Sequence, residues 1–313
     1  GRDGWADVFL VAPATANTVG KIAAAIDDSP VTTTATTALG AGVPVVVAPA
    51  MHEPMYDHPG VLDAIERVRS WGVEFVDPRI EEGKAKIATE EAIVTGVANA
   101  TTEQTLAGKS VVVTAGATTE SIDPIRTLSN RASGRTGRAV ARALAIRGAD
   151  VTLVHDGDDV HYADVLAVES AAEMVEAVEA AVDADADALV SAAAISDFTV
   201  EAADEKIRSG EARTLDLEPA PKLIDTVRES HPDLAIVGFK AETTGDDEAM
   251  VGEARRIMDR VGLAFVVAND ASVMGADETR ALVVRADETS EYVGSKDGLG
   301  ARVAVELAGE FEK

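Results

Sequence analysis

The sequence predicts an α/β protein with parallel sheets, divided into a first, incomplete domain and a second, complete one. Short β-branched runs alternate with Ala-rich segments of helical periodicity, which is the pattern of parallel α/β sheets. The 313 residues are enough for about two domains of roughly 100–200 residues each. A polar, mixed stretch at 78–108 precedes a fresh apolar run at 110, so we place the domains at 1–103 and 104–313.

The expected elements follow from the hydrophobic pattern in chain order. Short apolar runs predict strands at 8–12, 43–48, 72–76, 110–115, 150–154, 188–193, 234–239 and 265–269. Apolar residues three or four positions apart predict helices at 16–25, 60–71, 134–147, 170–182, 222–230 and 246–261. A hairpin at 280–285 and 290–294 and a helix ending near Phe311 close the chain. We therefore expect two Rossmann-like domains, which bind ligands at the carboxyl ends of their strands.

The charge of the chain excludes some partners. Lys and Arg number 28 and Asp and Glu number 55, for a net charge of -27. Such a surface repels nucleic acid and anionic membranes, so we expect neither as a partner. Acidic residues are interspersed with apolar ones and Lys is scarce, which indicates a halophilic, folded protein in a cytoplasm of high salt.

Other compositional features narrow the chemistry. The chain has no Cys, which excludes disulfides, thiolate metal sites and Cys nucleophiles. No apolar run reaches the roughly 18–20 residues of a membrane helix, and no signal peptide is visible. A strand-like run begins almost at once after Gly1, so we expect a chain cut from a longer protein and a cytoplasmic location.

Two polar clusters follow neighbouring predicted strands of the first domain. Thr15, Asn17 and Thr18 stand where a strand ends and a helix begins, which suits a phosphate or a polar ring edge but also an ordinary helix cap. His52 follows the second strand within Ala48-Pro-Ala-Met-His, and a lone His there is also typical of a surface residue. Because parallel strand ends meet at one crevice, the two clusters together indicate a ligand site.

The second domain carries a longer series of polar turns. Its first strand runs into Gly116, and a long loop through Asn130 reaches Gly134 at a helix start, where backbone N–H groups can approach a phosphate. The loop length and the absent G-x-G-x-x-G pattern disfavour a nicotinamide site. Further on, Asp197 and Lys206 suit a metal-bound nucleotide phosphate, although Asp197 is equally suited to capping a helix.

These motifs resemble a known family. Ala12-Pro-Ala-Thr-Ala-Asn-Thr18 resembles the Pro-Ala-Ser-Ala-Asn-Thr motif of flavin-dependent cysteine decarboxylases, and Pro49-Ala-Met-His52 resembles their Pro-Ala-Met-Asn motif. The second domain is similar to phosphopantothenate–cysteine ligase. The order of motifs over nearly the whole chain matches the bifunctional coenzyme A biosynthesis family, in which that ligase is fused to phosphopantothenoylcysteine decarboxylase.

For the first domain the resemblance implies a decarboxylase-like fold that binds FMN. The implied FMN positions are Thr15, Ala16, Asn17, Thr18 and Ala50. His52 stands at the family's substrate Asn, and the family's proton-donor Cys has no counterpart. Lys84 and Lys86 lie on the matching flap at 78–87, where they would meet a substrate phosphate or form a plain surface pair. The family's essential His and flavin phosphate loop precede Gly1, so we expect this 313-residue chain to lack decarboxylase activity.

For the second domain the resemblance implies ligation of cysteine to 4′-phosphopantothenate through an acyl-nucleotide made with CTP. Asn130 and Lys206 take the catalytic positions, with His52 as the catalytic candidate of the first domain. Asp197 is the expected Mg²⁺ ligand. The implied nucleotide positions are Ser191, Ala192, Ala193, Asp197, Lys206, Pro221, Lys222, Leu223, Ile224, Phe239, Arg256 and Arg260.

The resemblance also implies a homo-oligomer, with a dimer of the ligase domain. Two other functions stay open from the residues: a nicotinamide oxidoreductase, and a flavin-binding protein without catalysis. The order of preference between CTP and ATP is not decided by any motif.

Overall fold

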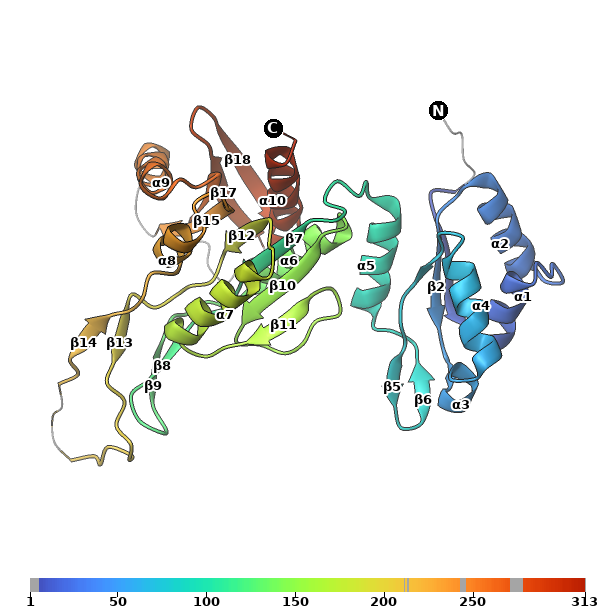
Figure 1. The fold of residues 1–313 in the computed structure, drawn as a ribbon, viewed down its shortest axis with the longest axis horizontal. Helices are drawn as coiled ribbons and strands as arrows, with labels where there is room; N and C mark the ends of the chain where they lie inside the picture. The colour runs from blue at the N-terminus through green and yellow to red at the C-terminus, as the bar shows by residue number, and fades with distance from the viewer. Residues whose placement is uncertain (1–5, 211, 213, 243–245, 271–277, 313) are drawn as a thin grey trace. The chain divides into compact units, whose positions relative to one another are not determined.

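The computed structural model describes residues 6–312 apart from 211, 213, 243–245 and 271–277. It divides into two compact units, residues 1–104 and 105–313 (Figure 1). None of the helices in the described part of the chain has the length and apolar character that a membrane span needs.

The first unit is built on a parallel sheet in the order β1-β2-β4. Its strands are β1 (Phe9–Ala14), β2 (Val45–Pro49) and β4 (Glu74–Phe75). Residues of β2 alternate between two cores, so both faces of this strand are covered. One face packs against α1 (Ala16–Ala23), α2 (Pro30–Ala41) and α4 (Pro59–Arg69), and the other against α5 (Glu90–Thr101).

A second, antiparallel sheet of the first unit has the order β3-β6-β5. It consists of β3 (Met51–His52), β5 (Arg79–Glu81) and β6 (Lys84–Lys86), with the short α3 (Glu53–Tyr56) after β3. The hairpin turn places Glu82 and Gly83 at positive φ (52° and 71°). The stretch at 78–108 that the sequence analysis treated as polar and mixed therefore holds this hairpin and α5.

Helix α2 was not predicted, because its Thr and Val residues are β-branched and favour strands. Local hydrogen bonds offset that preference. Ser29 and Thr32 form a capping box at the N-terminus, Pro30 occupies the first turn, and Gly42 ends the helix at φ 70°. The hydroxyls of Thr34 and Thr37 donate to carbonyls four residues earlier.

The second unit contains an eight-stranded sheet in the order β11-β10-β7-β12-β15-β16-β17-β18 among the described residues. The strands from β11 to β16 are parallel, and β17 and β18 are antiparallel. Their bounds are β7 (Ser110–Thr114), β10 (Asp150–His155), β11 (Asp164–Ala167), β12 (Ala188–Ser191), β15 (Ala235–Glu242), β16 (Phe265–Asp270), β17 (Glu278–Val284) and β18 (Thr289–Ser295). The predicted α/β class and the closing hairpin are confirmed.

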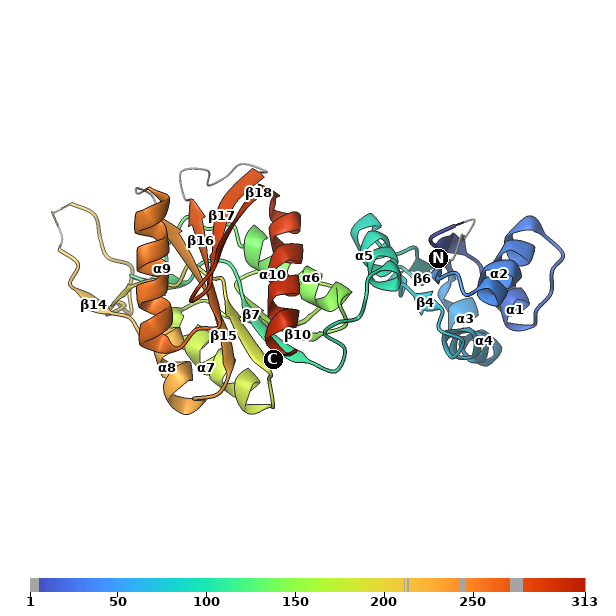
Figure 2. The same cartoon turned by 90° about the horizontal axis from the view of Figure 1, so that it is seen from above.

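Alternate residues of each central strand enter opposite cores. Val111 and Val113 of β7 pack on one side, whereas Val112 packs on the other. Helices α6 (Arg135–Ile146) and α10 (Lys296–Glu310) cover the first side. Helices α7 (Ala171–Asp183), α8 (Leu223–Ser230) and α9 (Asp247–Val261) cover the second (Figure 2). The chain order of the strands reverses between β7 and β12, which is where such sheets bind ligands.

Two short antiparallel ribbons were not predicted. One joins β8 (Thr119–Ser121) to β9 (Thr127–Ser129), and the other joins β13 (Phe198–Val200) to β14 (Leu217–Pro219). The ribbon of β13 and β14 projects from the sheet in Figure 1. The predicted strand at 188–193 ends at Ser191, because the chain turns there toward this ribbon.

Candidate active site

A cavity of about 730 Å³ lies at the carboxyl ends of β12 and β15, beside the reversal of strand order. Predicted positions from five separate chain segments line it, so the structure brings most of the proposed nucleotide set together. These are Asn130, Ser191, Ala192, Ala193, Asp197, Pro221, Lys222, Leu223, Ile224, Phe239 and Arg260.

One buried hydroxyl fixes the backbone of the turn after β12 by hydrogen bonds. The side-chain oxygen of Thr114, at the end of β7, accepts hydrogen bonds from the backbone N–H groups of Ala192 and Ala193, both at 3.1 Å. Thr114 is 0% exposed, so no water competes for these amides. Ala192 and Ala193 carry only methyl side chains, so the side of the turn that faces the cavity has room for a bulky ligand.

The loop that carries Asn130 is fastened to the same turn. The Asn130 side-chain amide donates to the carbonyl of Ala194 at 3.0 Å, and the backbone N–H of Ala194 donates to the carbonyl of Gly116 at 2.9 Å. The Thr118 hydroxyl accepts from the backbone N–H of Ser196 at 2.8 Å. The loops after β7 and β12 therefore form one hydrogen-bonded wall of the cavity.

Gly134 begins α6 at φ 66°, a left-handed conformation that favours glycine. A Cβ at this position would lie 2.9 Å from the backbone nitrogen of Gly116, so the residue must also be small. The first turn of α6 contains no acidic residue, and Arg131 and Arg135 line the cavity nearby. A helix N-terminus flanked by guanidinium groups favours an anionic ligand.

Asp197 supplies a carboxylate at the rim of the cavity. Its side chain is exposed, and its backbone carbonyl accepts from the N–H of Ala220 at 3.0 Å, which joins the two ends of the ribbon of β13 and β14. No cluster of three or more His, Asp or Glu with metal-ligand geometry occurs among the described residues. A single carboxylate still suits Mg²⁺, which keeps several waters and takes its remaining ligands from substrate phosphates.

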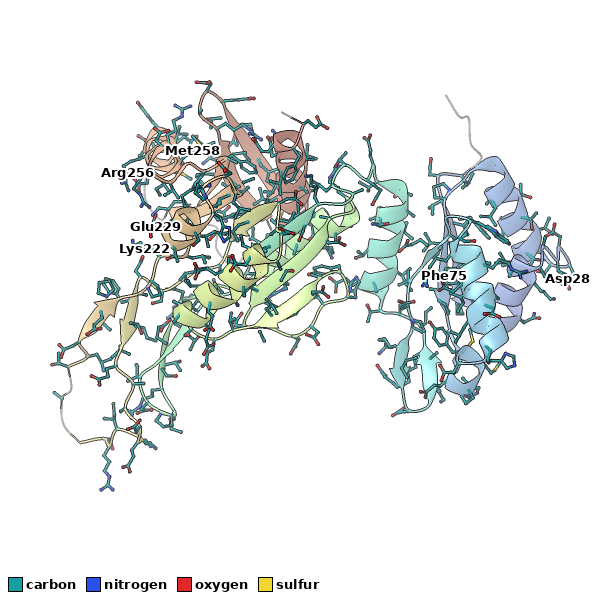
Figure 3. All side chains as sticks on the ribbon, in the orientation of Figure 1. Asp28, Phe75, Lys222, Glu229, Arg256 and Met258 are labelled. Atoms are coloured by element: carbon teal, nitrogen blue, oxygen red, sulfur yellow. The ribbon has the colours of Figure 1, made fainter. Side chains whose placement is uncertain are left out.

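Two predicted residues lie outside the cavity lining. Lys206 is exposed on the segment between β13 and β14. Arg256, labelled on α9 in Figure 3, is 63% exposed and forms two 2.7 Å hydrogen bonds with Glu253 of its own helix. Arg260 does line the cavity and pairs with Asp225 at 2.7 Å. Of these two predicted nucleotide positions on α9, Arg260 lines the cavity and Arg256 does not.

Some lining residues were missed by sequence reasoning. They are Arg131, Ser133, Lys240, Asn269, Thr279 and Lys296. The hydroxyl of the buried Thr279 donates to Asn269 at 3.2 Å, across the pairing of β16 with β17. Asn269 stands at the end of the predicted strand at 265–269, so its strand-end position was a signal for it. Thr279 and Lys296 do not follow a parallel strand, so the expectation that ligands bind at the carboxyl ends of parallel strands gave no signal for them.

In the first unit the segments that carry the two polar clusters begin at the adjacent ends of β1 and β2. Thr15 caps α1 by accepting from the N–H of Thr18 at 3.3 Å, and the two hydroxyls lie 3.1 Å apart. The N–H of Ala50 donates to the carbonyl of Ala14 at 2.9 Å, which joins the ends of β1 and β2. Ala16 and Asn17 form the first turn of the same helix.

His52 lies on the hairpin sheet, paired with Lys84 of β6. Both side chains are exposed. Lys86 instead pairs with Glu81 at 2.9 Å and Glu82 at 3.1 Å, and the hydrogen bond to Glu81 is the main cause that raises the pKa of Lys86. Of the two flap lysines, Lys84 has no ion pair among the residues that the structure describes, so it is the better placed for a substrate phosphate.

Two family models match the chain. Residues 106–310 match the DNA/pantothenate metabolism flavoprotein C-terminal domain, and residues 3–102 match the flavoprotein model. Together the two matches cover both units.

The chain is similar to curated proteins called coenzyme A biosynthesis bifunctional protein CoaBC. The protein from Thermococcus kodakarensis is 48% identical over 286 residues, which cover 90% of this chain and 71% of the relative. The protein from Bacillus subtilis is 37% identical over 287 residues, which cover 87% and 69%.

Solved structures resemble the second unit. The C-terminal domain of a coenzyme A biosynthesis bifunctional protein CoaBC is 26% identical, with a TM-score of 0.57, over 67% of this chain and 99% of that one. A DNA/pantothenate metabolism flavoprotein from Streptococcus pneumoniae has a TM-score of 0.58 at 20% identity, over 64% and 99%, which shows the shared fold.

Proposed function

The chain belongs to the family of bifunctional coenzyme A biosynthesis proteins, and from that premise we propose that its second unit joins cysteine to 4′-phosphopantothenate, with CTP as the activating nucleotide. The family combines phosphopantothenate–cysteine ligase with phosphopantothenoylcysteine decarboxylase. The observation that supports the placement is the cavity at the reversal of strand order, lined by polar residues from separate segments.

The reaction needs an activated carboxylate, because a carboxylate anion is a poor electrophile. The carboxylate oxygen of phosphopantothenate attacks the α-phosphorus of CTP, and pyrophosphate leaves. The cysteine amine then attacks the carbonyl carbon of the acyl-nucleotide, the amide bond forms, and CMP departs. Asp197 would hold Mg²⁺, which would supply positive charge to the triphosphate, and Lys206 would offset charge on the departing pyrophosphate.

Other residues of the cavity bind and orient. Phe239 is half-buried on β15, where its ring offers an apolar surface to the nucleotide. Lys222 at the start of α8 and Arg260 on α9 supply cations to the phosphates, and the backbone from Pro221 to Ile224 shapes that side. Asn130 orients the carbonyl for attack by the amine, because it carries hydrogen-bonding groups without charge.

The first unit fits FMN as its cofactor. The residues that would hold it are Thr15, Ala16, Asn17, Thr18 and Ala50, and they suit it because exposed hydroxyl and amide groups surround a helix N-terminus next to small residues. Bound FMN would supply a reversible electron acceptor for the thiol side of phosphopantothenoylcysteine, so that CO₂ can be lost and the electrons are then returned to the product. His52 and Lys84, which are paired on the hairpin sheet, bind the carboxylate and phosphate of that substrate.

We also propose that the protein works as a homo-oligomer, with a dimer of the second unit. Phe198 and Leu217 of the projecting ribbon are exposed apolar residues, which suits a subunit contact. Sedimentation of Phe198→Asp against the unchanged chain tests this: a dimer that survives the substitution places the contact elsewhere.

The ligase assignment is tested by pyrophosphate release from CTP with phosphopantothenate, first without and then with cysteine. We expect release in both cases and the amide only with cysteine. Lys206→Gln should reduce the release about 10²–10³-fold. Absence of phosphopantothenate-dependent release from the folded chain would contradict the assignment, and hydride transfer from a nicotinamide would favour an oxidoreductase instead.

A further inference from the structure

Asp123 is a buried carboxylate that holds two distant parts of the second unit together. The residue is 2% exposed and lies between β8 and β9. Its Oδ1 accepts from the backbone N–H groups of Ile125 and Arg126, both at 2.9 Å, which forms a local turn. Its Oδ2 accepts from the backbone N–H of Ile207 at 3.0 Å and from the Arg126 guanidinium. The two oxygens therefore do separate tasks.

The contact with Ile207 is made on both of its backbone groups. While Oδ2 of Asp123 accepts from the N–H, the Arg126 guanidinium donates to the carbonyl of Ile207 at 2.6 Å. The N–H of Ala203 also donates to the carbonyl of Ile122 at 3.0 Å. Burial raises the pKa of Asp123, but the hydrogen bonds from Arg126, Ile125 and Ile207 outweigh burial and lower it, so the anion persists at neutral pH.

Lys206 is the residue next to this contact, and its own side chain is exposed without an ion pair among the described residues. The ladder that joins β13 to β14 spans Phe198–Val200 and Leu217–Pro219, so Lys206 lies well beyond it. The Lys206 side chain is long and flexible, and its segment lies outside the ladder, so it loses much conformational freedom when its ammonium group binds a phosphate. Fixing the neighbouring backbone beforehand lowers that cost.

We propose that Asp123 is a positioning residue for the ligase reaction, because its Oδ2 and the Arg126 guanidinium fix the backbone beside Lys206. The inference rests on the proposed function of Lys206 at the departing pyrophosphate. It assigns to Asp123 no contact with substrate: the carboxylate acts through Ile207.

The separate tasks of the two oxygens define the variant. Asp123→Asn retains one oxygen for the turn at Ile125 and Arg126 but replaces Oδ2 with an NH₂ group, which cannot accept from Ile207. We expect kcat for pyrophosphate release without cysteine to fall about 10–100-fold at saturating CTP and phosphopantothenate. Asp187→Asn is the matched control, since Asp187 also accepts from a cation, Lys109, and a backbone N–H, Ser110, both at 2.8 Å, outside the cavity lining. It should retain the original kcat.

A double variant separates positioning from a general structural role. If Asp123 acts through Lys206, Asp123→Asn should cost nothing further in a Lys206→Gln background. Hydrogen exchange of the Ile207 amide gives a readout without turnover: exchange should speed up in Asp123→Asn and stay slow in Asp187→Asn. Should Asp123→Asn fail to fold, Arg126→Lys provides the same tests, because it retains the charge but lacks the planar fork that reaches Ile207.

The outcomes are distinguishable. Normal pyrophosphate release by Lys206→Gln overturns the proposed role of Lys206. A large loss in Lys206→Gln with an unchanged kcat in Asp123→Asn overturns the positioning role alone. Equal multiplicative losses in the single and double variants also overturn it, because they show that Asp123 acts independently of Lys206.

Discussion

The side-chain amide of Asn130 donates a hydrogen bond to the backbone carbonyl of Ala194 at 3.0 Å. One of its two N–H donors is therefore occupied within the protein, and the remaining N–H and the side-chain carbonyl are left for a ligand. The contact joins the loop after β7 to the turn after β12. Asn130 thus has a structural partner and a position on the cavity wall at once.

We predict that Asn130→Asp separates the two halves of the ligase reaction. An anion would face the carbonyl of Ala194 and repel it, and it would present no donor to the acyl-nucleotide. Pyrophosphate release without cysteine should persist, whereas amide formation with cysteine should be lost. The measurement is a parallel assay of both products, with thermal unfolding to record the loss of one hydrogen bond, about 1 kcal/mol. Full amide synthesis by Asn130→Asp would refute the orienting role.

Thr114→Val tests the support beneath the turn after β12. Valine has the same shape but accepts no hydrogen bond, so the N–H groups of the half-buried Ala192 and Ala193 would lose their acceptor. Each such group costs about 1–3 kcal/mol. We expect lower unfolding stability and a raised KM for CTP. Thr152→Val on β10 is the control, because this half-buried Thr has no side-chain hydrogen bond among the described residues; an equal effect there would contradict the argument.

Arg260 and Arg256 should differ in their effects on the nucleotide. Arg260 lines the cavity, whereas Arg256 is exposed and bound to Glu253. Arg260→Ala should raise the KM for CTP, and Arg256→Ala should leave it near the original value. Initial rates over a CTP series measure both. A larger effect of Arg256→Ala would mean that the Glu253 pair opens when nucleotide binds.

Sequence reasoning found the elements whose residues are buried on both faces. The apolar runs of β7, β12, β15 and β16 are unbroken because helices cover both sides of the sheet. The edge strand β11 (Asp164–Ala167) is mostly exposed and carries no such run, so it was missed. Helix α2 was missed for the opposite reason: its composition favours a strand, and caps formed by Ser29 and Gly42 determine its structure instead.

The candidate site was predictable as far as it follows parallel strand ends. Ser191 is the last residue of β12, and it lies at the cavity together with the residues that follow it up to Asp197. Thr279 reaches the same cavity from β17, which returns antiparallel to β16, and no local pattern indicates that return. The pairing of Arg256 with Glu253 was likewise not visible, although the spacing of three residues on a helix is compatible with it.

Salt should stabilise this protein. The net charge of -27 means that exposed carboxylates repel one another in the folded state. Exposed ion pairs such as Lys21 with Asp28 contribute little and are screened as well, so the repulsion dominates the response. Screening shortens the Debye length from about 10 Å at 0.1 M to about 3 Å at 1 M. The Tm should therefore rise from low salt to molar KCl, and equal Tm values in circular dichroism would contradict this prediction.

Stability should also fall in mild acid because of His155. This residue is 1% exposed at the end of β10, and neither ring nitrogen has a hydrogen-bond partner in the described structure. Burial is the main cause that lowers the pKa of His155, the Arg138 guanidinium adds to it, and Asp156 and Asp158 oppose it. The unfolded chain therefore takes up a proton near pH 6.5 while the folded chain stays neutral. Stability is retained above that pH and declines as the pH falls toward the lower pKa of the folded state, by at most about 1.4 kcal/mol per pH unit from this group.

His155→Leu should flatten the dependence of Tm on pH between 5 and 7, because it replaces the titrating group with an apolar side chain. His231→Leu is the control, since it removes a half-buried imidazole beside Asp183 of the same unit. If Tm falls between pH 7 and pH 5 as steeply in His155→Leu as in the unchanged chain, carboxylates and not this imidazole determine the loss of stability in acid.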